Sequence, residues 1–134
     1  MSYVLDTTLV SALMRGEPAA STRLLRERPV DVVVPQPAVA EVTYGLERLP
    51  PSRRRRDLEV RLATLLAAVA RSPWTDEVSQ RFGEIKADLE RRGKRVDDFD
   101  VAIAAHALAG EAVLVTRNLR HFAEVRGLVV DDWS

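Results

Sequence analysis

Short apolar runs alternate along the chain with longer segments in which apolar residues recur every three or four positions. Such short runs are typical of buried strands, and the longer segments are typical of helices with one apolar face. Gly and Pro residues separate many of these segments and mark their ends. The pattern predicts strands at residues 3–5, 32–34, 112–115 and 128–130, with a further extended piece within residues 69–74.

The periodic segments predict helices at residues 9–14, 19–28, 37–49, 52–70, 77–92 and 100–109. The helix at residues 100–109 is apolar on nearly every side, so we expect it to be buried. Strands that alternate with helices predict a three-layer α/β fold, with a mostly parallel central sheet, flanking helices and right-handed crossovers. A length of 134 residues fits one domain, residues 1–134.

The amino-acid composition excludes several classes of protein and of metal site. Hydrophobic residues make up 46% of the chain and charged residues 30%, the balance of a globular domain. No apolar run approaches the roughly 20 residues of a membrane span, and the N-terminus does not resemble a signal peptide, so we expect a cytoplasmic protein with no membrane partner. Cysteine is absent, which excludes thiolate zinc sites and leaves oxygen ligands for a metal. Twenty basic and twenty acidic residues cancel, so any nucleic-acid contact must be local.

Three acidic residues fall at strand ends or helix starts, where ligands bind in open α/β sheets. Asp6 directly follows the first strand, Glu41 lies early in the helix after the second, and Asp100 opens the buried helix. Clustered carboxylates raise one another's pKa unless a counter-charge is present, and a divalent cation supplies one. Mg²⁺ and Mn²⁺ prefer oxygen ligands and promote phosphate-ester hydrolysis. The pattern therefore predicts a Mg²⁺ or Mn²⁺ site formed by these three catalytic acids.

Further polar side chains are expected at the same edge of the sheet. The auxiliary residues of the predicted site are Thr7, Asp98, Thr116 and Asn118. Arg117 and Arg120 follow the strand at residues 112–115 beside the site, and a guanidinium suits forked contacts to phosphate. They are the predicted contacts to a phosphate backbone.

Each acid also has a simpler structural explanation. Asp6 fits the N-cap of the following helix. Asp97, Asp98 and Asp100 fit an acidic first turn favoured by the helix dipole. Glu41 fits an exposed helix residue, but its apolar neighbours make it the most informative of the three acids.

Other conspicuous residues are assigned to structure rather than to the site. His106 lies among alanines and leucine, where burial is a better explanation than metal ligation, and it is left out of the site. The arginine run at residues 53–56 is interpreted as a solvated helix start, although it has the charge to meet RNA or an acidic partner. Trp74 and Trp133 are interpreted as packing residues.

Four stretches in this order resemble the PIN-domain endoribonuclease toxins of VapBC toxin–antitoxin pairs. They are residues 4–8 (VLDTT), residues 38–45 around Glu41, residues 98–105 around Asp100, and residues 114–118 (LVTRN) followed by His121-Phe122; residues 127–133 are similar to the usual end of the family. The resemblance implies a PIN fold, Mg²⁺ or Mn²⁺, hydrolytic cleavage of RNA, a cognate VapB-like antitoxin and a homodimer.

The sequence departs from the family pattern at two positions. Asn118 stands where many members have a fourth acid, so a second metal is expected to bind weakly or only with substrate. Thr8 stands where Asn or Ser is common, which alters the hydrogen bonding expected around Asp6.

Two alternatives to a ribonuclease remain open. A phosphatase with an aspartate nucleophile is disfavoured, because it usually needs a second aspartate at the position of Thr8 and a lysine near Thr116. A catalytically weak PIN-like interaction domain would keep the scaffold without efficient cleavage. Metal-dependent cleavage of RNA distinguishes this second alternative from the nuclease.

Overall fold

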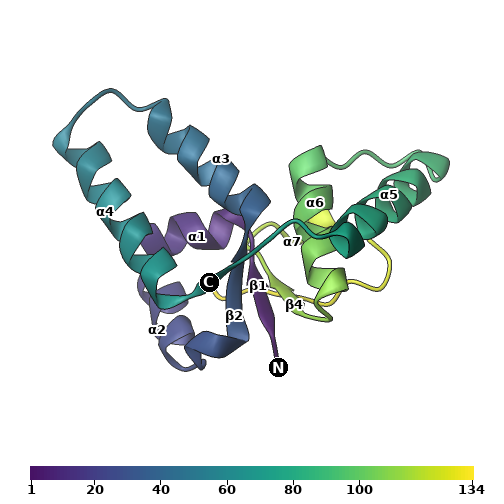
Figure 1. The fold of residues 1–134 in the computed structure, drawn as a ribbon, viewed down its shortest axis with the longest axis horizontal. Helices are drawn as coiled ribbons and strands as arrows, with labels where there is room; N and C mark the ends of the chain where they lie inside the picture. Colours follow the sequence, from purple (N-terminus) through teal and green to yellow (C-terminus); the bar gives the residue numbers. More distant parts are fainter.

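A five-stranded parallel sheet forms the centre of the protein, which a computed structural model describes over residues 1–134 (Figure 1). The strands are β1 (Tyr3–Leu5), β2 (Val32–Pro35), β3 (Ala70–Ser72), β4 (Val113–Val115) and β5 (Val130–Asp131). Their order across the sheet is β3-β2-β1-β4-β5, and all four pairings are parallel. The predicted α/β class is confirmed, and the sheet is parallel throughout rather than mostly parallel.

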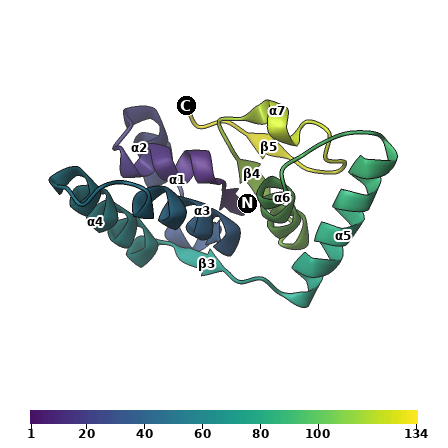
Figure 2. The ribbon, with the colours of Figure 1, turned by 90° about the horizontal axis from the view of Figure 1, so that it is seen from above.

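Helices cover both faces of the sheet, which completes three layers. They are α1 (Thr7–Met14), α2 (Pro18–Leu25), α3 (Gln36–Glu47), α4 (Arg53–Ala68), α5 (Asp76–Arg91), α6 (Asp98–Ala109) and α7 (Leu119–Phe122). Figure 2 shows α1 to α4 gathered on one side of the sheet and α5 and α6 on the other. None of these helices is both long and apolar enough to cross a membrane.

The core lies between the sheet and these helices. Leu5, Val32, Val34, Leu114 and Val115 of the inner strands have no exposed surface. Every residue from 101 to 107 of α6 is buried, as the apolar pattern predicted. Most of these buried residues are alanines, whose small side chains allow close packing against the sheet and α5.

Several boundaries differ from those that the pattern predicted. α6 begins at Asp98 rather than Asp100, because the Asp97 carboxylate caps the helix by accepting from the Phe99 N–H at 2.9 Å. α2 ends at Leu25, and a short 3-10 turn (Pro29–Asp31) leads into β2. α7 has only four residues, too few to show helical periodicity, and was not predicted. β5 lies at Val130–Asp131 instead of residues 128–130.

His106 of α6 packs against Ser72 of β3 and the Trp74 ring, and only 2% of its surface is exposed. Its Nδ1 lies 2.9 Å from the Ser72 hydroxyl, whereas its Nε2 has no hydrogen-bond partner. Burial lowers the pKa of His106 to about 4, because the charged imidazolium loses its hydration. The side chain is therefore a neutral part of the core at physiological pH.

His106 is expected to make the protein less stable as the pH falls from about 6.5 to about 4. In this range the unfolded chain binds more protons than the folded chain, so the free energy of unfolding decreases, by up to ~3 kcal/mol at 1.36 kcal/mol per pKa unit. Urea midpoints measured against pH for the wild type and His106→Leu would isolate this contribution. Native-state NMR of the two histidines provides the direct check, and a His106 titration near 6.5 would contradict the prediction.

Candidate acidic active site

The strand order places the candidate site at the point where the chain reverses its direction across the sheet. β1, β2 and β3 follow one another toward one edge, and the chain then returns to place β4 on the other side of β1. Ligands of open α/β sheets bind at such switch points, beyond the carboxyl ends of the strands. Asp6 directly follows β1 and Thr116 directly follows β4, so both lie at this position.

Asp6 is the most enclosed acid of the site, with 2% of its surface exposed. Its Oδ1 accepts from the Thr8 hydroxyl at 2.6 Å and from the Leu9 N–H at 3.0 Å, and its Oδ2 accepts from the Thr116 hydroxyl at 2.5 Å. Burial raises the pKa of Asp6, although these hydrogen bonds oppose the rise. The hydrogen bond from the Leu9 N–H makes Asp6 the N-cap of α1, so the structural role expected for Asp6 from the sequence is confirmed.

Two threonine hydroxyls connect Asp6 to the loop after β4. The Thr8 hydroxyl, which donates to Asp6, accepts from the Arg117 N–H at 3.0 Å. The Thr116 hydroxyl likewise donates to Asp6, and it accepts from the Asn118 N–H at 2.9 Å. The hydroxyls of Thr8 and Thr116 together set the orientation of the Asp6 carboxylate.

Glu41 reaches the site from α3, on the side of β2. It is half-buried, and its Oε1 accepts from the Thr7 hydroxyl at 2.5 Å. Thr7 is the first residue of α1, so this contact joins the starts of two helices. The explanation of Glu41 as an ordinary exposed helix residue is wrong.

Asp100 lies in the first turn of α6, with its Oδ2 3.2 Å from Nδ1 of His121. Burial raises the pKa of Asp100 to about 6; the charge of His121 opposes this rise, whereas the charges of Glu41 and Asp97 add to it. Asp100 therefore stands in the field of two other carboxylates. The sequence analysis assigned no role to His121. Its position shortly after β4, near Thr116, could have indicated that it lies beside the site.

Asp97 and Asp98, the two acids that precede Asp100, make different contacts. Asp98 forms an ion pair with Lys86 of α5 at 2.9 Å and is exposed, so the structure does not bring it to Asp6 and Glu41. Asp97 instead lines the same cavity as Glu41. Consecutive residues on a helix point in different directions, and the run of acids in the sequence did not reveal which of them faces the site.

The predicted phosphate contacts and the amide at Asn118 lie in the exposed loop after β4. Arg117 forms an ion pair with Glu17 at 2.6 Å. Arg120 is exposed and forms no ion pair, and Asn118 is exposed with no hydrogen bond from its side chain. Arg120 is consequently the freer of the two predicted cations.

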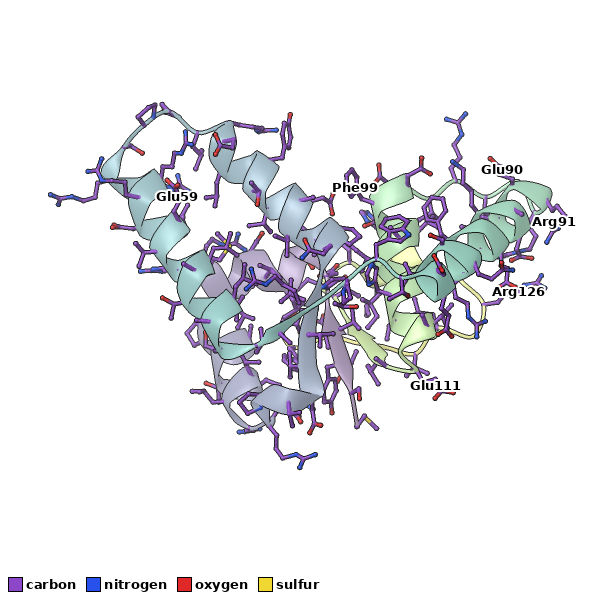
Figure 3. The ribbon with its side chains drawn as sticks, in the orientation of Figure 1. Glu59, Glu90, Arg91, Phe99, Glu111 and Arg126 are labelled. Carbon is purple, nitrogen blue, oxygen red and sulfur yellow. The ribbon has the colours of Figure 1, made fainter.

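A cavity of about 810 Å³ opens beside Glu41, between α1, α3, α4 and the start of α6, and neither Asp6 nor Asp100 lines it. Thr7, Glu41 and Asp97 contribute acidic and hydroxyl groups to its lining. Three cations, Arg15, Arg48 and Arg54, line it as well. Figure 3 shows side chains of α3 and of the α6 start, including Phe99, on the two sides of this region. The lining therefore combines two carboxylates and three guanidinium groups with eight hydrophobic residues.

The donor set of the site fits Mg²⁺ or Mn²⁺ chemically. No three His, Asp or Glu side chains form a closed ligand cluster in this structure. Mg²⁺ keeps several waters and needs only one or two carboxylates, so a closed cluster is not required. Burial is the main cause of the raised pKa of Asp6 and of Asp100, and a bound divalent cation would favour the ionised form of both carboxylates.

Comparisons with known proteins identify the family of this chain. Residues 3–128 match the model of the PIN domain family. The chain is 31% identical to the ribonuclease VapC2 of Haemophilus influenzae over 99% of its own length and 98% of that protein. It is 28% identical to the tRNA(fMet)-specific endonuclease VapC of Shigella flexneri, over 100% and 99% of the two chains.

Solved structures show the same fold. A chain in the crystal structure of VapBC2 from Rickettsia felis, bound to a DNA fragment from its promoter, superposes with a TM-score of 0.90 at 23% identity, covering 100% of both chains. A chain of VapBC-1 from nontypeable Haemophilus influenzae superposes with a TM-score of 0.85 at 25% identity, covering 99% of this chain and 98% of that one. The chain therefore belongs to the PIN-domain family, among the VapC ribonucleases of VapBC toxin–antitoxin pairs.

Proposed function

We propose that this protein is a Mg²⁺- or Mn²⁺-dependent endoribonuclease that hydrolyses RNA phosphodiester bonds as the toxin of a type II toxin–antitoxin pair. The observation that carries the proposal is the position of Asp6, Glu41 and Asp100. Asp6 follows β1 at the switch point of the sheet, Glu41 on α3 lines a cavity with arginines in its walls, and Asp100 in the first turn of α6 feels the charge of Glu41. Relatives named as ribonucleases over nearly the whole chain support it.

Asp6, Glu41 and Asp100 would hold the metal ion. When bound, a divalent ion activates water for attack on the phosphorus atom and stabilises the charge on the leaving oxygen. Thr8 and Thr116 hold Asp6 in one orientation, Thr7 holds Glu41, and His121 positions Asp100. Asp98 has no part in this proposed site, because it is paired with Lys86.

Arg117 and Arg120 are proposed to contact phosphates of the RNA on the side of the loop after β4. Arg120 is available in this structure, whereas Arg117 must share its charge between the RNA and Glu17. Asn118 brings an amide and no charge to the same loop, which favours a single tightly held metal ion. The proposed partners are RNA, a VapB-like antitoxin and a second copy of this chain.

The proposal is tested by cleavage of cellular RNA with the wild type and Asp6→Asn, in the presence of Mn²⁺ or Mg²⁺ and in EDTA. Asn caps helices as well as Asp does, so α1 is expected to stay intact. Loss of one ligand charge is expected to slow cleavage about 10³-fold, because metal catalysis supplies several kcal/mol and each 1.36 kcal/mol is a factor of ten. EDTA is expected to abolish cleavage by the wild type.

Two other outcomes would contradict the proposal. Equal cleavage by the wild type and Asp6→Asn would identify a contaminating nuclease. No cleavage by either, although the folded wild type binds Mn²⁺, would favour the interaction domain without catalytic activity.

A further inference from the structure

The carboxylate of Glu17 bridges two arginines beside the proposed active site. Its Oε1 accepts from Nη1 of Arg117 at 2.6 Å. Its Oε2 accepts from Nη2 of Arg15 at 2.6 Å and from Nε of the same side chain at 3.0 Å. The hydrogen bonds from Arg15 and Arg117 hold the pKa of Glu17 below its ordinary value. Glu17 is therefore ionised at physiological pH and takes part of the charge of both guanidinium groups.

The turn between α1 and α2 presents this carboxylate to the loop after β4. Arg15 is the C-cap of α1, and Arg117 lies 100 positions beyond Glu17, directly after Thr116. Gly16 has a φ of +70°, a conformation that glycine adopts readily and that bends the chain at the end of α1. The Glu17 N–H donates to the carbonyl of Ala12 at 3.1 Å, which fixes the bend. The contact with Arg117 thus joins two segments that are separate in the sequence.

The loop after β4 is held in place without Glu17. The Arg117 N–H donates to the Thr8 hydroxyl at 3.0 Å, and the Asn118 N–H donates to the Thr116 hydroxyl at 2.9 Å. Thr116 is completely buried. The side chains of Arg117 and Glu17 are 36% and 34% exposed, and a pair at the surface adds little stability, because water and salt screen it. The main effect of Glu17 is therefore on the charge that Arg117 offers to a ligand.

A carboxylate between two guanidinium groups occupies the place that an oxyanion of a ligand would take. Arginine binds carboxylates and phosphates with the same forked N–H donors. A phosphate that approaches Arg117 must displace Glu17 or share the guanidinium with it. In either case the protein loses part of an ion pair when the phosphate binds. The affinity of Arg117 for a phosphate is thus lower than it would be without Glu17.

We propose that Glu17 is an internal competitor of the RNA phosphate backbone, which occupies Arg117 and Arg15 in the free protein and is displaced when RNA binds there. The inference rests on the proposed ribonuclease function and adds to it a residue that limits the affinity for RNA. Phosphate contacts supply the sequence-independent part of nucleic-acid affinity. Glu17 therefore weakens the attraction to RNA of any sequence.

The test measures binding of a fluorescein-labelled single-stranded oligoribonucleotide by fluorescence anisotropy, in the Asp6→Asn background so that the RNA stays intact. Glu17→Gln keeps the shape of the side chain and is expected to tighten binding about 2- to 5-fold, because no surface ion pair has to be broken. The logarithm of the affinity is also expected to fall more steeply with the logarithm of the salt concentration, by about 0.7 for one more phosphate contact. Glu27→Gln is the matched control, because Glu27 pairs with Arg23 instead, and unchanged binding is expected.

Arg117→Gln shows whether the gain comes through the ion pair. In this variant, Glu17→Gln is expected to tighten binding much less than in the protein with Arg117. An equal gain with and without Arg117 would mean that Glu17 acts only as a nearby negative charge, and the inference would be wrong. Weaker or unchanged binding by Glu17→Gln would also overturn it.

The outcome for the proposed function is read separately, from cleavage by the protein with Asp6 intact. Metal-dependent cleavage of RNA would leave that function standing even where the Glu17 variants overturn the inference. If the wild type neither bound nor cleaved RNA, both the inference and the proposed function would fall.

Discussion

Asp100→Asn is expected to slow metal-dependent RNA cleavage about 10³-fold and, in the metal-free protein, to raise the free energy of unfolding. Asp100 is partly buried, and burial together with the charges of Glu41 and Asp97 raises its pKa to about 6. Between the usual pKa of 3.8 and about 6, the folded chain binds more protons than the unfolded chain, so stability falls as the pH rises through this window. At pH 7 the ionised carboxylate therefore destabilises the fold, and a neutral amide of the same shape removes that effect.

The expected gain is about 1–3 kcal/mol at pH 7, from 1.36 kcal/mol per pKa unit with an allowance for the exposed part of the side chain. The expected loss of cleavage is about 10³-fold, as for other groups that stabilise charge in the transition state. Urea denaturation in EDTA measures the first quantity, and RNA cleavage with Mn²⁺ measures the second. Added Mn²⁺ is expected to stabilise the wild type and to have much less effect on the variant.

Asp98→Asn is the matched control, because Asp98 lies in the same turn of α6 but forms its ion pair with Lys86 on the surface. This variant is expected to cleave RNA like the wild type and to unfold at nearly the same urea concentration. If Asp98→Asn lost cleavage and Asp100→Asn kept it, the assignment of the two acids would have to be exchanged. If Asp100→Asn were less stable than the wild type in EDTA, the carboxylate would be stabilising and the electrostatic argument would be wrong.

Trp133→Ala is expected to lower the free energy of unfolding by about 3–5 kcal/mol, the usual cost of deleting a buried tryptophan side chain. Only 4% of Trp133 is exposed. Its ring meets the edge of Tyr3 of β1 at 5.3 Å between ring centres, and the guanidinium of Arg23 lies 4.9 Å from its centre. These contacts join the last residues of the chain to the first strand and to α2. A marginally stable domain has about 5–15 kcal/mol in total, so the effect is large.

Urea denaturation followed by circular dichroism measures this loss. Trp133→Phe keeps an aromatic ring against Tyr3 and is expected to recover much of the stability. Trp74→Ala is the comparison, because Trp74 is 47% exposed and its removal leaves a smaller unfilled volume. An unchanged midpoint for Trp133→Ala would mean that the end of the chain contributes nothing to the stability of the domain.

The sequence alone determined the class of fold and the place of the acids, because both depend on local signals. The alternation of apolar runs and periodic segments identified β1, β2, β4 and most helices, and the apolar α6 was correctly expected to be buried. Parallel strands bring their carboxyl ends to one edge of a sheet. The positions of Asp6, Glu41 and Asp100 next to strand ends or helix starts therefore predicted one shared region before any contact was known.

Only the tertiary structure decided which side chains meet there. The Thr116 hydroxyl binds Asp6 across 110 positions of the chain, and His121 meets Asp100 across 21. A local pattern carries no information about such pairs, since strand pairing and helix packing bring them together. The same packing turned Asp98 toward Lys86, so one predicted auxiliary acid was placed away from the others.

The cavity also depended on packing alone. Tyr44 and Phe99 look like ordinary apolar positions in the sequence, but α3 and α6 leave both rings exposed in the space beside Glu41. Arg48 and Arg54 belong to separate segments that meet only when α3 and α4 pack together. The sequence thus determined the elements and the chemistry available at their ends, and the folded chain decided, through contacts between distant residues, which of those groups act together.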